Sequence, residues 1–186
     1  MLAEEQPKSR TKSALREAVE TIVITLLIYL LVRTFLFENY RVEGNSMMPT
    51  LEDEQYLVVS KLDYRLHEPQ RGDIIVFHDP NDSSRRLIKR VIGLPGEVVE
   101  IRNGQVYANG LLLAEAYIQS PGLSSRPPTP IPDGYLFVLG DNRTNSSDSR
   151  NWGPLPRQEI VGKAWFSYWP PRLWGMIRNE VYGDVP

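Results

Sequence analysis

The sequence predicts a mainly β protein, with an antiparallel and partly barrel-like β-sheet domain that follows one N-terminal transmembrane helix. Three observations support this fold class. Residues 21–37 are apolar, with Arg33 as their only charge. After Glu38 the chain consists of short β-branched or aromatic runs, bounded by clusters of Gly, Pro, Asn and Asp. No helical periodicity of ordinary length follows the anchor, which favours strands throughout the domain.

Size and composition limit the classes of function. The 186 residues allow one anchor and one domain of roughly 150 residues, which is enough for a hydrophobic core. A net charge of -2 gives no electrostatic basis for nucleic-acid binding. The absence of cysteine excludes thiol catalysis and cysteine-ligated zinc, and two histidines leave little for another metal site. We therefore expect no metal, no cofactor and no nucleic-acid partner.

The apolar segment is expected to be an uncleaved membrane anchor. Its seventeen residues make about 25 Å of helix, at the short end for a span. Residues 21–32 alone would also suit a signal-peptide core or a buried helix. Two points favour the anchor: Arg33 lies near one end, where it can reach the interface, and residues 33–38 offer no small-x-small cleavage pattern.

The charges before the anchor predict its orientation. Residues 1–17 are polar and carry four basic side chains, Lys8, Arg10, Lys12 and Arg16. By the positive-inside tendency this segment stays in the cytoplasm. We expect a cytoplasmic N-terminus at residues 1–17, the anchor at 18–37 and an extracytoplasmic β-rich domain at 38–186.

Within the domain, strands and turns alternate. Strands are expected at residues 55–60, 73–77, 87–92, 98–101 and 135–139. Asn103-Gly104 and Asn109-Gly110 are typical of tight hairpin turns. Five prolines in residues 120–133 predict an extended loop, so residues 98–134 are expected to form a small hairpin and loop insertion.

The C-terminal residues 165–174 are dense in aromatic side chains. Core packing is the favoured explanation, and contact with the membrane interface is the alternative, because Trp and Tyr favour that layer.

A candidate nucleophile, Ser46, lies nine residues after the anchor. Serine needs a base to remove its proton. His67 and His78 lie in polar loop sequences, whereas Lys89 lies between Leu87 and Val91 on one face of a predicted strand. A lysine among aliphatic side chains can have a lowered pKa and act as a base. Protection of a sheet edge is the alternative role for this lysine.

A third cluster, residues 140–150, combines two acids, two arginines and three serines in a loop rich in Gly and Asn. An exposed turn is one interpretation. The other is a loop that folds inward, pairs its charges and brings hydroxyl groups to the lysine.

These blocks resemble the conserved boxes of bacterial type I signal peptidases, the leader peptidases that use a Ser/Lys dyad. Residues 46–51 (SMMPTL) match the nucleophile box, 71–77 the following strand, 89–96 (KRVIGLPG) the lysine box and 140–150 the last box. The resemblance runs from about residue 18 to 171. Cytosolic self-cleaving repressors use similar chemistry, but they lack the membrane segment. The implied function is a membrane-anchored serine endopeptidase that removes signal peptides from exported preproteins and needs no cofactor.

The resemblance also implies the roles of individual residues. Ser46 is the expected nucleophile and Lys89 the expected general base. Ser146 is expected to hydrogen-bond and orient the lysine. Ion pairs are expected to hold the last loop, with the participants Asp141, Asp148, Arg90 and Arg150. The Ser46 N–H is expected in the oxyanion hole, where some members add a serine hydroxyl at the position of Gly44.

The implied substrate has small residues at the first and third positions before the cut. It is expected to add as a strand beside residues 40–45 and 82–89. Five residues are expected to line its shallow apolar pockets, with core packing as the alternative for each: Val42, Met47, Leu51, Leu87 and Ile88.

The expected partners are preprotein signal peptides, the lipid bilayer and the secretion translocon. The expected location is the bacterial cell membrane, or a thylakoid membrane where the organism has one. The alternative from another functional class is an inactive, membrane-tethered β module that binds signal sequences or translocation partners.

Overall fold

The computed structural model describes residues 10–180 and 182. Its contacts divide the chain into two compact units, with the boundary between Phe37 and Glu38. The expected N-terminal segment 1–17 lies partly outside the described residues.

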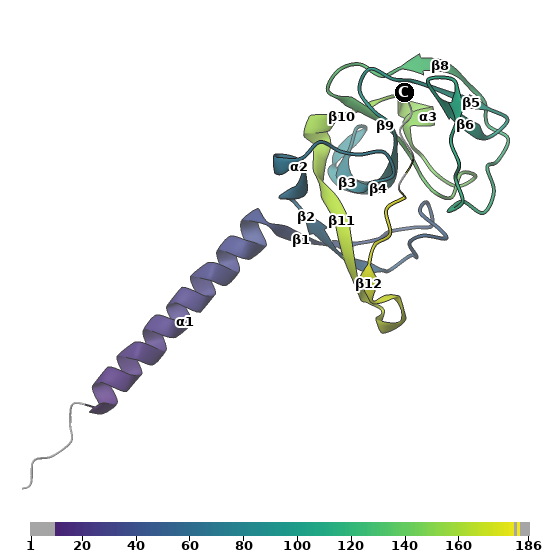
Figure 1. The fold of residues 1–186 in the computed structure, drawn as a ribbon. Helices are drawn as coiled ribbons and strands as arrows, with labels where there is room; N and C mark the ends of the chain where they lie inside the picture. The colour runs from purple at the N-terminus through teal and green to yellow at the C-terminus, as the bar shows by residue number, and fades with distance from the viewer. Residues whose placement is uncertain (1–9, 181, 183–186) are drawn as a thin grey trace, which may run out of the picture. The chain divides into compact units, whose positions relative to one another are not determined.

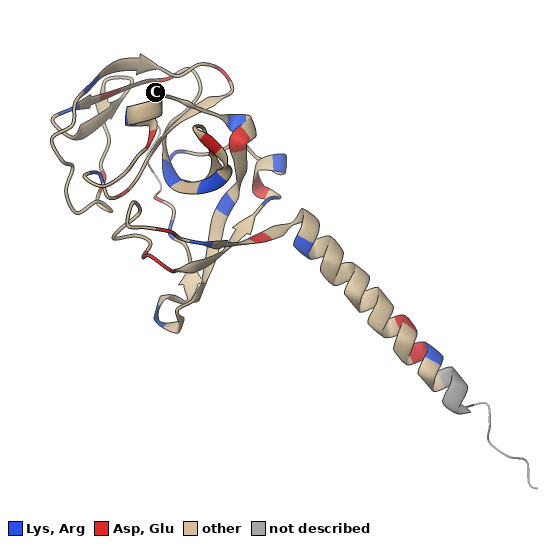
Figure 2. Ribbon diagram, turned by 180° about the vertical axis from the view of Figure 1, so that it is seen from behind, with Lys and Arg blue, Asp and Glu red and all other residues tan. Residues whose placement is uncertain are grey.

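The first unit contains one long helix, α1 (Arg10–Phe35). Its segment Ala14–Phe35 has 22 residues and a mean hydropathy of 1.9, and none of its most apolar window is buried. At 1.5 Å per residue this segment is ~33 Å long, which is enough to cross a bilayer core. In Figure 2 the charged residues on the coloured part of α1 lie near its two ends. Residues 21–32 between these charges carry no charged side chain.

The second unit is built on an eight-stranded sheet in the order β1-β2-β11-β3-β4-β9-β10, with β12 paired to β11 (Figure 1). Its strands pair antiparallel, as β3 does with β4 and β4 with β9. The mainly antiparallel β fold expected from the sequence is confirmed. The strand bounds are β1 (Phe37–Arg41), β2 (Tyr56–Ser60), β3 (Ile74–Asp79), β4 (Asp82–Gly93), β9 (Tyr135–Leu139), β10 (Leu155–Pro156), β11 (Ile160–Trp169) and β12 (Gly175–Met176).

A smaller four-stranded sheet has the order β7-β6-β5-β8. Its strands are β5 (Val98–Arg102), β6 (Gln105–Ala108), β7 (Leu111–Leu112) and β8 (Arg126–Pro130). The two predicted hairpin turns are present. Asn103-Gly104 has φ values of 48° and 82°, and Asn109-Gly110 has 50° and 81°. Positive φ at both central residues fits the twist of a two-residue hairpin.

Helices in this unit are short. They are α2 (Asp63–Leu66), α3 (Ser149–Trp152) and the 3-10 turns η1 (Arg157–Glu159) and η2 (Pro171–Leu173).

Two expectations were wrong. The proline-rich segment forms strand β8, which pairs with β5 by placing Thr129 opposite Val99. Because β8 lies at the edge of its sheet, its prolines need not donate to a second neighbour.

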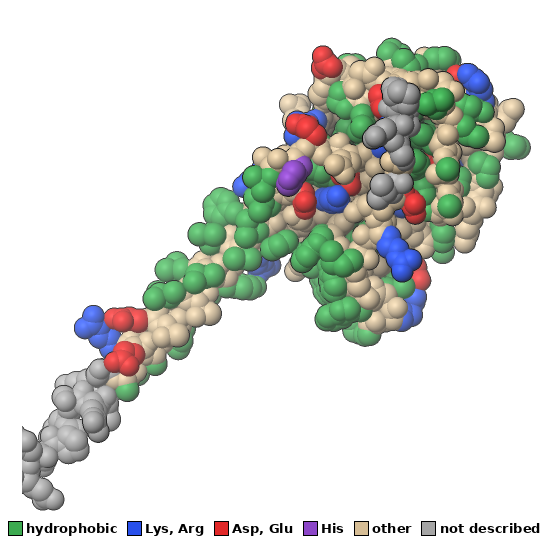
Figure 3. Space-filling model, viewed as in Figure 1, with side chains coloured by type: hydrophobic (Ala, Val, Ile, Leu, Met, Phe, Trp, Pro, Cys, Tyr) green, Lys and Arg blue, Asp and Glu red, His purple; other side chains and the backbone are tan. Residues whose placement is uncertain are grey.

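Core packing also does not account for the tryptophans near the C-terminus. Trp165, Trp169 and Trp174 are 42%, 53% and 68% exposed, and Figure 3 shows apolar side chains gathered on the surface of this unit.

Three buried apolar clusters stabilise the second unit, and one of them supports the loop after β1. This cluster joins Met47 and Leu51 of that loop to Ile74 and Ile88 of strands β3 and β4. The loop is therefore anchored by side chains that bury apolar surface against the sheet.

Candidate active site

Ser46 is half-buried in the loop after β1 and precedes Met47, which belongs to the buried cluster. Two hydrogen bonds from Asn142 hold this loop. The Asn142 N–H donates to the Ser46 carbonyl at 3.0 Å, and the Asn142 Nδ2 donates to the Asn45 carbonyl at 3.0 Å. Gly44 has a φ of +80°, a conformation that glycine adopts without strain. The serine backbone is thus fixed by the core below it and by a second loop beside it.

Lys89 lies on β4, opposite Ile75 of β3, and is 2% exposed. Its Nζ donates to the Ser46 Oγ at 2.8 Å and to the Ile88 carbonyl at 2.9 Å. Residues that are 43 positions apart in the sequence therefore meet as an amine and a hydroxyl.

The buried position changes the acidity of this amine. Desolvation lowers the pKa of Lys89 from 10.5 to about 8, against the opposing effect of the carboxylates of Asp148 and Asp141. Burial disfavours the charged form of a lysine. A neutral amine, which can accept a proton, is therefore available near physiological pH.

The loop after β9 closes the site from the other side. A Cβ atom on Gly140 would meet the Ser46 carbonyl oxygen at 2.5 Å and would also meet the Ser146 side chain. Glycine at this position therefore permits the close approach of the two loops.

Ser146 lies in the site, but the expected hydrogen bond to Lys89 is absent from this structure. The Ser146 Oγ is buried and has no hydrogen-bond partner within the described part of the chain. Lys89 instead donates to Ser46 and to its own neighbouring carbonyl.

An ion pair without solvent access fixes the start of the loop. Arg90 and Asp141 have side chains that are 1% and 0% exposed, with Nη2 and Oδ2 2.7 Å apart. Asp141 also accepts from the Thr50 hydroxyl at 2.5 Å, and Arg90 donates to the Gly72 carbonyl at 2.9 Å. Because the pair is satisfied on both sides, it links the nucleophile loop, β4 and the last loop.

A second pair, Arg150 with Asp148, fixes the end of the loop with an Nε–Oδ1 distance of 2.8 Å. Asp148 also caps α3 and accepts from the Gly140 N–H at 3.0 Å. Of the two interpretations of residues 140–150, the structure has the loop folded inward with its charges paired.

Sequence reasoning missed three contributors: Thr50, Asn142 and the buried pair Arg143–Glu115, whose Nη2 and Oε1 are 2.5 Å apart. Thr50 and Asn142 lie in matched boxes, but nothing else in the sequence indicated a role for either residue in the site. Glu115 lies outside every matched box, so only the fold brings it to Arg143.

The expected pocket residues lie mainly in the core. Val42, Met47, Leu51 and Ile88 are at most 3% exposed and belong to one cluster. Leu87 packs against a different cluster, because successive residues of a strand point to opposite faces. The structure therefore does not bring all five side chains to one open surface.

Among the described residues, neither histidine forms a hydrogen bond with Ser46. His67 is exposed after α2, and the Nδ1 of His78 lies 3.2 Å from the Ser83 carbonyl oxygen. Within the described residues, Lys89 is the titratable group that contacts the Ser46 hydroxyl.

Residues 15–169 match the family model described as "Signal peptidase, peptidase S26". The chain belongs to the signal peptidase I family. It is 45% identical over 175 residues to "Probable signal peptidase I-1" of Synechocystis sp., covering 90% of this chain and 89% of that protein. It is 39% identical to "Signal peptidase I" of Bacillus amyloliquefaciens, covering 91% and 96%. It is also 35% identical to "Thylakoidal processing peptidase 1, chloroplastic" of Arabidopsis thaliana, covering 84% of this chain and 48% of that protein.

Membership of the signal peptidase I family gives the class of activity: a membrane-anchored serine endopeptidase of the S26 family that removes signal peptides. The long apolar helix agrees with an anchor, and the relatives include bacterial and thylakoidal enzymes.

Proposed function

We propose that the chain removes signal peptides with Ser46 as nucleophile and Lys89 as general base. The observation that carries this proposal is the 2.8 Å hydrogen bond between the Lys89 amine and the Ser46 hydroxyl. Because burial lowers the pKa of Lys89 to about 8, the amine can take up the serine proton without a histidine.

In the proposed reaction the Ser46 Oγ attacks the carbonyl carbon of the scissile bond while Lys89 accepts the hydroxyl proton. The lysine then gives this proton to the leaving amine, and an acyl-enzyme remains. Lys89 next removes a proton from an attacking water, and the second tetrahedral intermediate collapses to release the carboxylic acid and restore Ser46.

The Ser46 N–H is proposed as an oxyanion donor. In the described part of the chain this N–H has no hydrogen-bond acceptor, so it is available to a substrate oxygen. Gly44 supplies no side-chain donor, and its own N–H is taken by the Asp53 carboxylate at 2.7 Å. A single oxyanion-hole donor commonly contributes about 10²–10³-fold in rate.

The support roles follow from the ion pairs. We propose that Arg90–Asp141 and Arg150–Asp148 hold the last loop, and that Ser146 orients Lys89 when substrate is bound. The buried hydroxyl of Ser146 supports this role, because an unsatisfied buried polar group is costly unless it gains a partner.

The substrate is proposed to lie along β4. This strand pairs with β3 over most of its length, but with β9 only from Arg90 to Gly93. One edge of residues 82–89 therefore has no neighbouring strand among the described residues, which leaves room for an added strand. Two carbonyls of β4 already have side-chain donors, Arg86 from the Tyr40 hydroxyl at 3.2 Å and Ile88 from the Lys89 amine at 2.9 Å, so the added strand is proposed to use the other backbone groups of this edge. Pockets for small side chains are proposed over the cluster that holds Val42, Met47, Leu51 and Ile88, without Leu87, which packs against a different cluster.

The membrane arrangement is proposed from the sequence: residues 1–17 in the cytoplasm, 18–37 across the bilayer and 38–186 outside, with the insertion at 98–134. The bilayer and the secretion translocon are proposed partners. The membrane is that of a bacterial cell, or a thylakoid membrane where one exists. Confinement to one membrane raises the effective concentration of enzyme and signal peptide.

Cleavage of a purified preprotein by the full chain in detergent tests the proposal. Ser46→Ala and Lys89→Ala should each lower the cleavage rate by at least about 10³-fold. Ser120→Ala, on an exposed serine outside the proposed site, and His78→Ala are the controls and should cleave normally. Wild-type cleavage by either dyad variant would exclude that residue from the mechanism. A wild-type chain that binds signal peptides without cleaving them would instead support the inactive binding module.

A further inference from the structure

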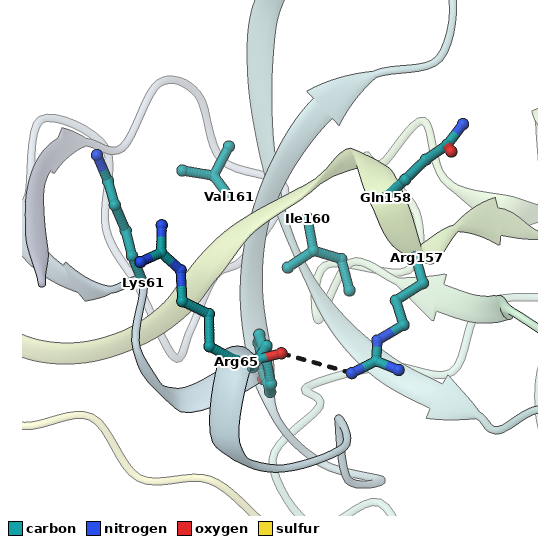
Figure 4. Close-up of a pocket in the computed structure, with 7 residues that line it drawn as sticks. Lys61, Arg65, Arg157, Gln158, Ile160 and Val161 are labelled. Atoms are coloured by element: carbon teal, nitrogen blue, oxygen red, sulfur yellow. Dashed lines mark hydrogen bonds between the residues drawn. The ribbon is translucent and has the colours of Figure 1, made fainter. Parts of the chain in front are cut away.

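A second basic site lies away from the dyad, in a cavity of about 470 Å³ between α2, η1 and the start of β11 (Figure 4). Three cationic side chains line it: Lys61, Arg65 and Arg157. No carboxylate belongs to the lining that the structure describes. Ile160 and Val161 add an aliphatic wall, and Tyr64 and Gln158 complete the lining.

The three cationic side chains differ in whether a carboxylate already neutralises their charge. Lys61 pairs with Glu38 at 2.7 Å, and Arg157 pairs with Glu68 at 2.5 Å. The Glu68 side chain is 74% exposed, so this pair is weakened by solvent. The exposed guanidinium of Arg65 has no ion-pair partner within residues 10–180. The cavity therefore keeps an excess of positive charge.

Chain connectivity keeps this cavity near the bilayer. Glu38, the partner of Lys61, lies three residues after Phe35, where the apolar helix ends. Three residues span at most ~11 Å. Whatever the orientation of the two units, this ion pair therefore stays within reach of the lipid headgroups.

The adjoining surface is suited to lipid. Leu62, which precedes α2, and Leu66, its last residue, are 36% and 66% exposed. Exposed leucines beside basic residues are typical of segments that lie in the membrane interface. An acidic protein segment would match the charges but would leave these leucines unexplained.

From these observations we infer that the cavity of Lys61, Arg65 and Arg157 binds the phosphate headgroup of an anionic phospholipid. The guanidinium groups offer the paired donors that suit phosphate oxygens, and the lysine adds a point charge. The aliphatic wall accommodates the glycerol and the first carbons of the lipid. Binding there would hold the second unit at the membrane surface, independently of the peptidase chemistry.

Lipid binding to the full chain in non-ionic detergent, measured by native mass spectrometry, tests this inference. Phosphatidylglycerol and phosphatidylcholine with the same acyl chains are the two probes. We expect the first phosphatidylglycerol to bind at least about tenfold more tightly than phosphatidylcholine, and the double variant Arg65→Gln/Arg157→Gln to lose about 10- to 30-fold in that affinity.

Three further variants sharpen the test. Arg102→Gln/Arg172→Gln removes the same charge from two exposed arginines that also pair with glutamates, and should bind normally. Glu68→Gln removes the carboxylate that competes for Arg157 and should bind phosphatidylglycerol more tightly. Arg65→Gln alone removes a charge without breaking an ion pair and should also weaken binding, with an unchanged unfolding midpoint as the check that it is folded.

Three results would overturn the inference: equal affinity for the two lipids, equal loss in the control double variant, or thermal stabilisation by inorganic phosphate without any by phosphatidylglycerol. Cleavage of a short soluble peptide should be unchanged in all these variants. Failure of lipid binding with intact cleavage would leave the Ser46–Lys89 proposal untouched.

Discussion

Replacement of Lys89 by methionine tests the energetic cost of the buried amine. Methionine keeps an unbranched side chain of similar length but carries no proton. It also removes the hydrogen bonds to Ser46 and to the Ile88 carbonyl, a loss that contributes equally at every pH. The informative quantity is therefore the difference in free energy of unfolding between variant and wild type as a function of pH.

The expected size follows from the pKa. One pH unit corresponds to ~1.4 kcal/mol, so the fall in the Lys89 pKa from 10.5 to about 8 corresponds to about 3 kcal/mol of unfavourable charge burial. Below pH 8 the folded and unfolded wild-type chains both hold the proton, so the folded state bears the whole penalty. Between pH 8 and 10.5 the folded chain releases its proton while the unfolded chain keeps it. Wild-type stability should therefore rise relative to the variant in that window.

Urea unfolding of both full-length proteins in detergent, from pH 7 to 10.5, measures this difference. The stability of Lys89→Met relative to wild type should fall by about 3 kcal/mol across the range. Other titrating groups are common to both proteins and cancel. A difference that does not change with pH would show that the Lys89 amine is not penalised by burial, and would remove the basis for a neutral lysine base.

Three further predictions concern the loops around the dyad. Asp141→Asn should lower the free energy of unfolding by about 3–5 kcal/mol, because it leaves Arg90 buried without its counter-charge; a loss below 1 kcal/mol in urea unfolding would contradict this. Gly140→Ala should lower kcat by about 10²-fold, because the new methyl group must displace the Ser46 carbonyl; normal single-turnover cleavage would show that the loops have room. Ser146→Ala should leave the unfolding midpoint unchanged or higher, since it removes an unsatisfied hydroxyl, while kcat falls with KM unchanged; unchanged kcat would exclude a role in orienting Lys89.

The fold was predictable where its signals are local. The run 135–139 forms β9 with the expected bounds, and both Asn-Gly turns form where they were expected. The long strand β11 was missed because its alternation is blurred. Its first part, Ile160–Lys163, pairs with β3, and its last part, Lys163–Trp169, pairs with β2. Bulges shift the register in both pairings and so interrupt the regular alternation.

The candidate site was predictable in part, because Ser46, Lys89, Asp141 and Asp148 lie in short motifs. Their mutual geometry depends on contacts between distant segments, such as Thr50 with Asp141. No periodicity encodes such contacts. The expected bond from Ser146 to Lys89 shows the limit, since a motif fixes which residues come near one another but not which hydrogen bonds they form.

The ion pairs around the dyad have a consequence for the base itself. The carboxylates of Asp148 and Asp141 raise the pKa of Lys89, and each is paired with an arginine. Arg150→Gln would leave Asp148 with its backbone donors but without its counter-charge, so the protonated lysine would be favoured. The lower limb of the kcat/KM profile should therefore move to higher pH, with activity lost at pH 7 and largely regained near pH 9.5. Arg102→Gln, on an exposed arginine, should leave the profile unchanged. Equal loss of activity at every pH would show that Arg150 only supports the loop.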